Sequence, residues 1–123
     1  MKRAALIVGH GSREKGFQAA MQKVAKALEK SGRYGCVACA YLEVASPSIS
    51  QGIERLVRKG AGEIRVLPYF LLTGKHVKCH IPEIVAEAQK KFKGRAKIIL
   101  CPYLGFDEKI VSLVKRRLRE REK

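Results

Sequence analysis

Tryptophan is absent from this sequence of 123 residues, and acidic residues are scarce: 11 Asp and Glu stand against 26 Lys and Arg, a net charge of +15. This balance favours attraction of a polyanion, such as nucleic acid, anionic lipid or an acidic small molecule. The four Tyr and four Phe are not interleaved with the basic clusters, as a surface that stacks nucleic-acid bases requires. We therefore expect no specific nucleic-acid partner. A basic nucleic-acid-binding α/β domain is the non-enzyme alternative.

Long hydrophobic runs are missing as well. No segment approaches the roughly 20 apolar residues that a membrane-spanning helix needs. The opening MKRAALIVG has a basic start, but its apolar part continues into GHGSREKG without the small-residue cleavage site of a signal peptide. We therefore expect a cytoplasmic protein with no membrane partner, folded as a single domain over residues 1–123.

Cysteine is limited to four residues, of which Cys36 and Cys39 have the C-x-x-C spacing of zinc and redox sites. Both lie in the apolar stretch CVACAYLEV. In a strand they would point to opposite faces, which is poor geometry for a chelate. No helix follows them directly, as a redox C-x-x-C usually requires. We expect buried or incidental thiols, in keeping with a reducing compartment.

Apolar segments typical of strands alternate four times with helical patterns. The strands are expected at residues 4–8, 37–44, 63–72 and 96–104, and the helices at residues 14–30, from Pro47, at residues 77–92 and from Asp107. Ser46 is the expected N-cap of the second helix, with Pro47 at its first position. Strands that are apolar on both faces and alternate with helices form parallel sheets covered on both sides. The sequence therefore predicts an α/β fold: a three-layer, doubly wound sheet of four mainly parallel strands in the order 2-1-3-4.

Two histidines follow the first and third of these strands. His10 lies between two glycines in VGHGSR, and His76 ends LLTGKH. In the order 2-1-3-4, both leave from neighbouring strands at the topological switch point, where such sheets bind their ligands. Glu43, in YLEV at the end of the second strand, is placed on the same edge. The sequence thus predicts that these three side chains converge on one cleft.

Each of the three residues also has a simpler explanation. His10 can cap the following helix, its flanking glycines can serve only the tight turn, and Glu43 can pair with a surface lysine. As a set, two imidazoles suit a borderline divalent metal such as cobalt, iron, nickel or zinc. A site with two firm ligands leaves coordination positions open, unlike a structural zinc site, and suits a metal that is passed on. A neutral imidazole can also accept a proton near pH 7.

Three segments resemble the short class II tetrapyrrole chelatases of the CbiX and SirB type: LIVGHGSR, YLEVASPSISQGIERLVRKGAGEIRVLPYFLLTGKHVKCHIPEI and CPYLGFDEKIV. The resemblance covers nearly the whole chain. These enzymes insert a divalent metal into sirohydrochlorin, an acidic tetrapyrrole. The resemblance therefore implies a sirohydrochlorin chelatase with a chelatase-like, flavodoxin-like half-lobe. It also implies a homodimer, since a short chain builds one of the two lobes of longer chelatases.

The resemblance implies roles for individual residues. The metal-binding histidines of the family map onto His10 and His76, and the first is also the expected proton acceptor. The expected catalytic residues are His10 and Glu43, with Glu43 as a relay. The tetrapyrrole would lie between the end of the second strand and the loop before the third helix. The expected substrate-binding residues are Glu43, Ala45, Ser46, Phe70, Leu71, Leu72, Thr73, Gly74 and Lys75.

The metal is expected to be a substrate, with no permanently bound cofactor. We favour cobalt, as in cobalamin biosynthesis; iron insertion in siroheme synthesis and nickel insertion are the alternatives. The carboxylates of sirohydrochlorin would be attracted by the positive charge of the chain. Arg13, Lys75 and Lys78 lie near the motifs and are candidates to pair with them.

The chain departs from the family at one position. Members commonly have H-x-x-x-D-I-P, whereas this chain reads HVKCHIP, so His80 replaces an aspartate. On a helix, His80 lies on the same face as His76 and could assist the metal. We favour the alternative that it caps the helix start or faces solvent.

A histidine phosphatase is the nearest alternative among enzymes, because GHG is similar to the R-H-G motif of those proteins. Their arginine, which holds the phosphate, immediately precedes the histidine. Gly9 takes that place here, which argues against phosphoryl transfer.

Overall fold

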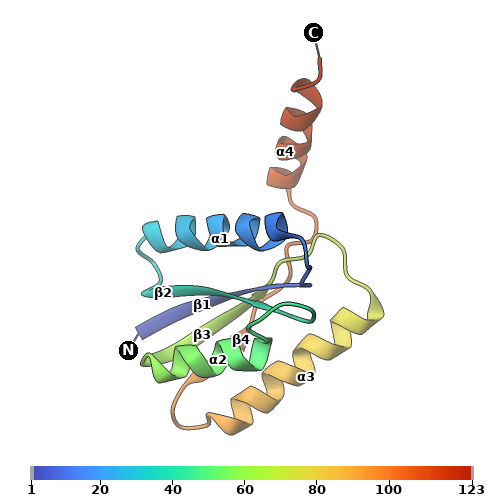
Figure 1. Ribbon diagram of the computed structural model, residues 1–123. Coiled ribbons are helices and arrows are strands. Elements are labelled where there is room, and N and C mark those ends of the chain that lie inside the picture. Colours follow the sequence, from blue (N-terminus) through green and yellow to red (C-terminus); the bar gives the residue numbers. More distant parts are fainter. Residues whose placement is uncertain (1, 123) are drawn as a thin grey trace.

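Strands and helices alternate along the chain in the computed structural model, which describes residues 2–75 and 77–122 (Figure 1). The elements are β1 (Lys2–Gly9), α1 (Lys15–Lys30), β2 (Cys36–Tyr41), α2 (Ile49–Arg58), β3 (Ala61–Pro68), α3 (Lys75–Lys91), β4 (Lys97–Leu100) and α4 (Glu108–Arg119). The strands form one parallel sheet in the order β2-β1-β3-β4. The predicted α/β fold and strand order are thus confirmed. Within the described residues, no helix is both long and apolar enough to cross a membrane.

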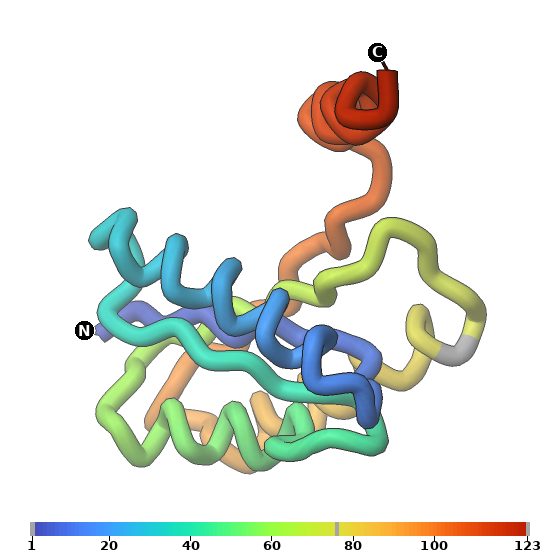
Figure 2. Tube along the Cα trace, turned by 45° about the horizontal axis from the view of Figure 1, so that its top comes forward, coloured from blue at the N-terminus to red at the C-terminus, as the bar shows by residue number. Residues whose placement is uncertain are grey.

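The helices are distributed over the two faces of the sheet. α1 lies on one face, over β1 and β2, while α2 and α3 lie on the other (Figure 1, Figure 2). The chain first moves from β1 to β2, at one edge of the sheet. It then crosses over β1 to β3 and continues in that direction to β4, at the other edge. Right-handed connections then place α1 opposite α2 and α3. α4 belongs to neither layer: in both views it stands away from the sheet.

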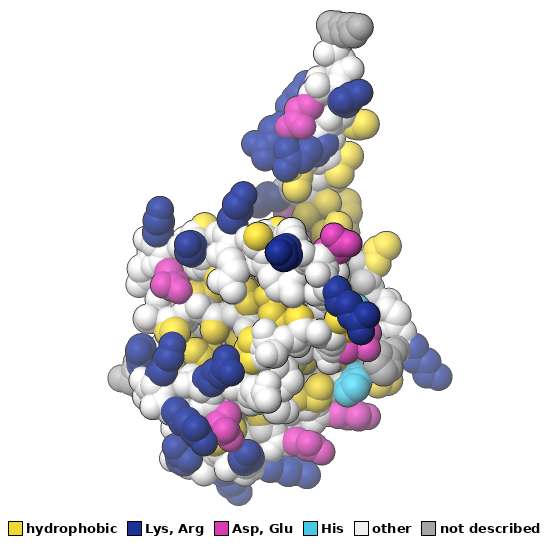
Figure 3. All heavy atoms as spheres, in the orientation of Figure 1, with side chains coloured by type: hydrophobic (Ala, Val, Ile, Leu, Met, Phe, Trp, Pro, Cys, Tyr) yellow, Lys and Arg dark blue, Asp and Glu magenta, His cyan; other side chains and the backbone are white. Residues whose placement is uncertain are grey.

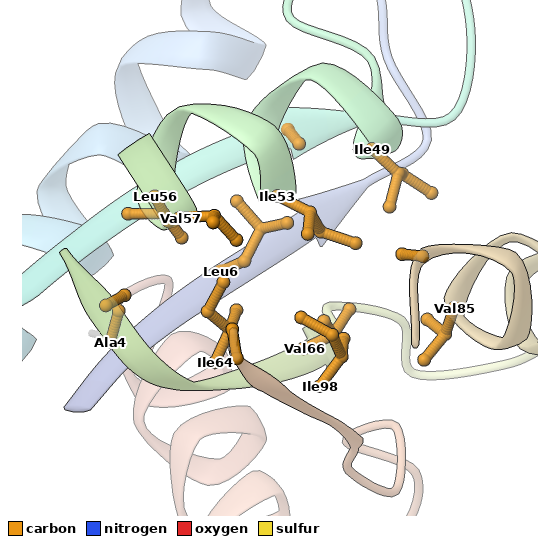
Figure 4. Packing of buried hydrophobic residues seen from close by; sticks show 14 of the residues in the cluster. Ala4, Leu6, Ile49, Ile53, Leu56, Val57, Ile64, Val66, Val85 and Ile98 are labelled. Atoms are coloured by element: carbon orange, nitrogen blue, oxygen red, sulfur yellow. The ribbon is translucent and has the colours of Figure 1, made fainter. Parts of the chain in front are cut away.

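The main hydrophobic core lies between the sheet and the pair α2 and α3. Figure 4 shows Leu6 of β1, Ile53 of α2 and Ile64 of β3 packed together there, and all three side chains are 0% exposed. Burying one such side chain contributes about 1.5–3 kcal/mol. A smaller cluster beneath α1 contains Ile7 and Met21. The two clusters fix β1 in the centre of the sheet, so that its carboxyl end lies at the switch point.

The four cysteines are free, as predicted. Cys36 packs against the core beneath α2 and α3, whereas Cys39 is buried in the cluster beneath α1. The two thiols therefore point to opposite faces of β2. Burial also raises the pKa of Cys39, which disfavours the thiolate that metal binding or redox chemistry needs.

Three strands end earlier than the sequence predicted, because a strand needs a neighbour to pair with. The third strand was expected over residues 63–72, but β3 ends at Pro68. The Tyr69 N–H still donates to Val8 O (2.7 Å). Because β1 ends one residue after Val8, the residues beyond Tyr69 have no strand beside them. β2 ends at Tyr41 and β4 at Leu100, against expected ends at residues 44 and 104. The residues beyond each strand become loops, and these loops carry the candidate site.

The start of α2 differs from the prediction. The helix begins at Ile49 with Ser48 as its N-cap, not at Pro47 after Ser46. The Ser48 hydroxyl accepts from Gln51 N–H (3.2 Å) and the Gln51 side chain accepts from Ser48 N–H (3.0 Å), a capping box that satisfies two donors. Pro47 is held outside the helix because its carbonyl accepts from Tyr41 N–H (2.9 Å).

The helix α3 also begins two residues before its expected start, at Lys75, with Gly74 as its N-cap. The Lys78 N–H donates to Gly74 O (3.1 Å), so the first helical turn is complete at that point. The predicted substrate loop is therefore short: only residues 69–74 lie between β3 and α3.

A buried carboxylate ties β1 to β3 at the amino end of the sheet. Glu63 is 8% exposed, and its Oε2 contacts Arg65 Nε (2.8 Å) and Arg3 Nε (3.0 Å). The hydrogen bond from Arg65 lowers the pKa of Glu63, the positive charges of both arginines act in the same direction, and burial opposes them. Glu63 thus stays ionised within the folded protein.

We expect this cluster to make stability depend on acid pH. Because the pKa of Glu63 is lowered from 4.5 in the folded state, its stabilising effect is complete above that value and is lost as the pH falls through the folded-state pKa. Glu63→Gln should therefore flatten the decline in the free energy of unfolding below pH 4.5, as measured by urea unfolding at several pH values. Glu29→Gln, which alters an exposed carboxylate, is the control. Equal pH dependence in the Glu63 variant and the unaltered protein would contradict the assignment.

Candidate functional site

The candidate site begins where β1 ends. His10 follows Gly9 directly, and its Nε2 lies 2.7 Å from Oε1 of Glu43, in the loop after β2. The two side chains are 49% and 58% exposed, so the pair is open to solvent on one side. The predicted convergence of His10 and Glu43 on the carboxyl edge of the sheet is therefore confirmed.

The main chain holds this pair in place. The Glu43 N–H donates to His10 O (3.0 Å), and the Leu42 N–H donates to Gly9 O (2.9 Å), so the two loops continue the pairing of β1 with β2. Gly11 has a φ of +106°, and a Cβ at this position would overlap the carbonyl oxygen of Glu43. Glycine is thus required both for the backbone conformation and for the close approach of the two loops.

Phe70 brings the loop after β3 to the same place. Its ring meets the His10 imidazole edge to face, with centroids 6.5 Å apart and planes at 89°. The Phe70 carbonyl accepts from Gly105 N–H (3.2 Å), which ties this loop to the segment after β4. The loops that follow β1, β2 and β3 therefore meet around one imidazole.

The two loops that carry Glu43 and Phe70 also carry exposed apolar side chains. Val44 is 60% exposed, Leu71 51% and Leu72 88%. Val44 also has a φ of +70°, a strained conformation for a β-branched residue, in the loop that follows β2. A group of exposed apolar residues beside a polar pair suits a large, flat ligand with polar edges.

The other residues predicted to bind substrate lie on the same two loops with different exposure. Ala45 is half-buried against the cluster beneath α1, and Ser46 is exposed and precedes a cis peptide bond. Gly74 caps α3, and Lys75 is the first residue of that helix. All four lie at the carboxyl edge, but no direct contact places them against His10.

A cavity of about 200 Å³ opens between the first turns of α3 and the segment after β4. Thr73 lines it, and its buried Oγ1 has no hydrogen-bond partner among the described residues. Pro102 and Tyr103 line it from the opposite side. Neither residue is among the expected substrate-binding residues, although both belong to the CPYL segment that carries part of the family resemblance.

The basic candidates are spread around this edge. Lys78 lines the cavity beside α3, while Arg13 is exposed in the loop after β1. A more open hollow of about 570 Å³ on the outer side of α3 is lined by Lys75, Cys79, His80 and Glu83. His80 therefore lies at the helix surface, in the second turn of α3.

His76 lies outside the described residues, so its predicted role as second metal ligand and its approach to His10 stay predictions. Among the residues that the structure does describe, no three His, Cys, Asp or Glu side chains are grouped closely enough to hold a metal ion. His10 and Glu43 together can offer one nitrogen and one carboxylate to an incoming cation.

Comparisons with known proteins show the family of this chain. The family model CbiX matches residues 4–121. Sirohydrochlorin ferrochelatase of Bacillus subtilis is 36% identical over 128 residues, covering 98% of this chain and 46% of the relative. Sirohydrochlorin cobaltochelatase of Sulfolobus acidocaldarius is 33% identical over 112 residues, covering 91% of this chain and 86% of the relative.

A solved structure has the same fold. The sirohydrochlorin chelatase SirB from Bacillus subtilis subspecies spizizenii, in complex with cobalt, superposes with a TM-score of 0.87 at 34% identity. The alignment covers 98% of this chain and 51% of that one. This chain therefore spans about half the length of the Bacillus proteins that it matches.

Proposed function

Because this chain belongs to the CbiX family of tetrapyrrole chelatases, we propose that it inserts a divalent metal ion into sirohydrochlorin. The observation that carries the proposal is the contact of 2.7 Å between His10 Nε2 and Glu43 Oε1, at an edge lined by exposed apolar side chains. An imidazole held by a carboxylate can deliver a metal and take up a proton. The apolar side chains offer the macrocycle a surface beside that pair.

The pair suggests a route for protons. In a neutral imidazole whose Nε2–H donates to Glu43, the Nδ1 lone pair is left for the metal ion. As the metal moves to the ring nitrogens of sirohydrochlorin, the pyrrole N–H groups lose their protons. We propose that, once the metal has left Nδ1, His10 accepts a pyrrole proton at that nitrogen and passes its Nε2 proton to Glu43. Since Glu43 is 58% exposed, its carboxyl can release that proton to water.

Cobalt is the metal that we favour, with iron and nickel as alternatives. The support is divided, because one relative is named a ferrochelatase and another a cobaltochelatase. A nitrogen ligand and an open coordination shell suit all three ions. The metal would be a substrate of the protein, and His76 would supply the second imidazole.

The loops around His10 would hold the tetrapyrrole. Val44, Leu71 and Leu72 would lie against its apolar face, and Phe70 would keep the His10 ring in its orientation. Lysine and arginine side chains would pair with its carboxylates, and Lys78, in the cavity beside α3, is the best placed of the candidates.

We further propose that the protein acts as a homodimer in the cytoplasm.

Anaerobic absorbance spectroscopy of sirohydrochlorin with Co²⁺, Fe²⁺ or Ni²⁺ tests the proposed function. We expect the protein to accelerate insertion of at least one metal far above the uncatalysed rate, and His76→Ala to abolish the acceleration. An unrelated basic protein at the same concentration controls for attraction of the substrate by charge alone. Equal rates with that protein for all three metals would contradict a chelatase.

Glu43→Gln should slow metal insertion by about 10- to 100-fold, within the range of general acid–base catalysis. Glutamine keeps an oxygen to accept from the His10 N–H but cannot take up the proton. Binding of Co²⁺ to the protein without tetrapyrrole, measured by visible absorbance, should weaken much less than the insertion rate falls. Glu29→Gln, on the exposed surface of α1, controls for lost charge. An unchanged rate in Glu43→Gln would exclude the relay.

A further inference from the structure

The cavity between α3 and the segment after β4 has no part in the proposed metal chemistry, and it suits one piece of a larger ligand. Its volume of about 200 Å³ lies below the roughly 300–1,000 Å³ of sites that enclose a drug-sized molecule. A whole tetrapyrrole does not fit, whereas a single side arm does. Most of the walls are apolar, formed by side chains such as Val77, Ile81, Leu100 and Tyr103. The occupant must therefore carry methylene groups or another apolar part.

Two polar side chains interrupt these apolar walls, and together they suit a carboxylate. Among the described residues that line the cavity, Lys78 is the only charged one, and it is exposed to solvent. The Oγ1 atom of Thr73 is buried and has no hydrogen-bond partner among the described residues. Cys101 also lines the cavity, and burial raises the pKa of its thiol, which therefore stays neutral. An ammonium group beside a hydroxyl donor favours an anion.

The Thr73 hydroxyl is a group that folding alone does not explain. A buried hydroxyl without a partner lowers the stability of the folded protein. Valine has nearly the same shape and would avoid this cost. A ligand that enters the cavity can satisfy the hydroxyl, which both donates and accepts hydrogen bonds. We therefore expect the hydroxyl to act in binding.

The cavity lies beside the metal site, at the switch point of the sheet. Pro68 lines the cavity and pairs with Val8, two residues before His10. Phe70, whose ring meets the His10 imidazole, comes three residues before Thr73. Their Cα atoms are therefore at most about 11 Å apart. A macrocycle centred on His10 can send an arm from its edge into the cavity.

Long-range attraction alone leaves the orientation of an acidic macrocycle open. Lysine and arginine side chains are spread over the face of the molecule shown in Figure 3, and along α4. Such a distribution draws an acidic ligand toward the protein without fixing how it is turned. A pocket that admits a single arm supplies this information, because the rest of the ring must then lie in one direction from it.

Sirohydrochlorin carries carboxymethyl and carboxyethyl arms, which differ by one methylene group. We propose that the cavity binds one carboxyethyl arm and that Lys78 and Thr73 hold its carboxylate. The methylene groups lie against Ile81 and Leu100. The longer arm is required because the Thr73 hydroxyl is buried, so the carboxylate must pass apolar side chains to meet it. The role of this pocket rests on the proposed function, because the arm belongs to the proposed substrate.

Titration of the protein with metal-free sirohydrochlorin under anaerobic conditions, followed by absorbance, tests the pocket. Lys78→Met removes the ammonium group, and Thr73→Val removes the hydroxyl with little change of shape. Each should weaken binding by about 10-fold or more, because a hydrogen bond to a charged group is lost. Lys90→Met, which alters an exposed lysine at the far end of α3, is the control and should bind like the unaltered protein. Thr73→Val should be at least as resistant to urea as the unaltered protein, which excludes misfolding as the cause.

A double variant shows whether both side chains hold the same carboxylate. If they do, Thr73→Val should cost little further binding once Lys78→Met is present, because the arm no longer stays in the cavity. Arm length is tested with two porphyrins that differ only in their arms, carboxyethyl in one and carboxymethyl in the other. Thr73→Val should weaken binding of the first by about 10-fold and leave binding of the second unchanged.

Unchanged binding in both single variants would overturn the pocket, as would losses that multiply in the double variant. Equal losses for the two porphyrins would contradict the assignment of the longer arm. The metallation assay decides the chelatase separately. Metal insertion with unchanged binding in the variants would leave the chelatase without this pocket, whereas weakened binding with no insertion would leave the pocket without the chelatase.

Discussion

Replacing His10 with alanine is expected to slow metal insertion by about 10²- to 10⁴-fold. The variant loses the imidazole that Glu43 holds at 2.7 Å and that Phe70 meets edge to face. Because we propose that this one ring both delivers the metal and accepts pyrrole protons, the variant should also bind Co²⁺ more weakly without tetrapyrrole. Initial rates from absorbance and metal titration of the same preparation measure the two losses separately.

His80→Ala is the matched control for this substitution. It removes a second imidazole from the same region, in the second turn of α3, and we favour a role for His80 outside the metal site. Its insertion rate should therefore stay within about threefold of the unaltered protein. Equal losses in the His10 and His80 variants would mean that His80 belongs to the metal site. Full activity of His10→Ala would remove the chemical basis of the proposed function.

Gly11→Ala is expected to lower the free energy of unfolding by at least about 3 kcal/mol, a large part of the 5–15 kcal/mol typical of a domain. A left-handed conformation costs a residue with a side chain roughly 1–2 kcal/mol, and here the added Cβ would also overlap the carbonyl oxygen of Glu43. The two loops would have to separate, which moves Glu43 away from His10. Urea unfolding monitored by circular dichroism measures the loss of stability. The metallation assay measures the loss of activity that follows when Glu43 moves away from His10.

Gly60→Ala separates the two causes. Gly60 has a φ of +95°, similar to the φ of +106° at Gly11, but an added Cβ there would meet no atom within 4 Å. It should therefore show only the conformational cost, about 1–2 kcal/mol, with an unchanged insertion rate. If the two variants were equally stable and equally active, the close approach of the loops around Gly11 would have no importance for the site.

Much of the fold followed from the sequence, because it depends on the order and apolarity of segments. Strands that are apolar on both faces alternate with amphipathic helices, and that pattern determined the strand order and brought Glu43 to His10. The pairing of these two side chains could be predicted since both follow neighbouring strands. It did not require knowledge of any side-chain contact.

The details at the ends of the elements did not follow from local composition. The apolar residues Phe70 to Leu72 read as strand, yet no neighbouring strand extends far enough to pair with them. Pro47 is typical of a first helical position, but its carbonyl instead accepts from Tyr41 and leaves the N-cap to Ser48. Such boundaries depend on tertiary partners, which a sequence pattern does not contain.

The loop that carries Glu43 has a further consequence at the outer edge of the sheet. β2 is an edge strand with the uncharged sequence CVACAY, and unpaired edges of this kind can add a strand from another molecule. The Tyr41 N–H faces this edge, and it is already bonded to Pro47 O as the chain folds back in parallel beside it. The turn at Pro47 thus blocks strand addition at the end of β2 next to His10. Any aggregation that starts on this edge must begin at its far end, near Cys36.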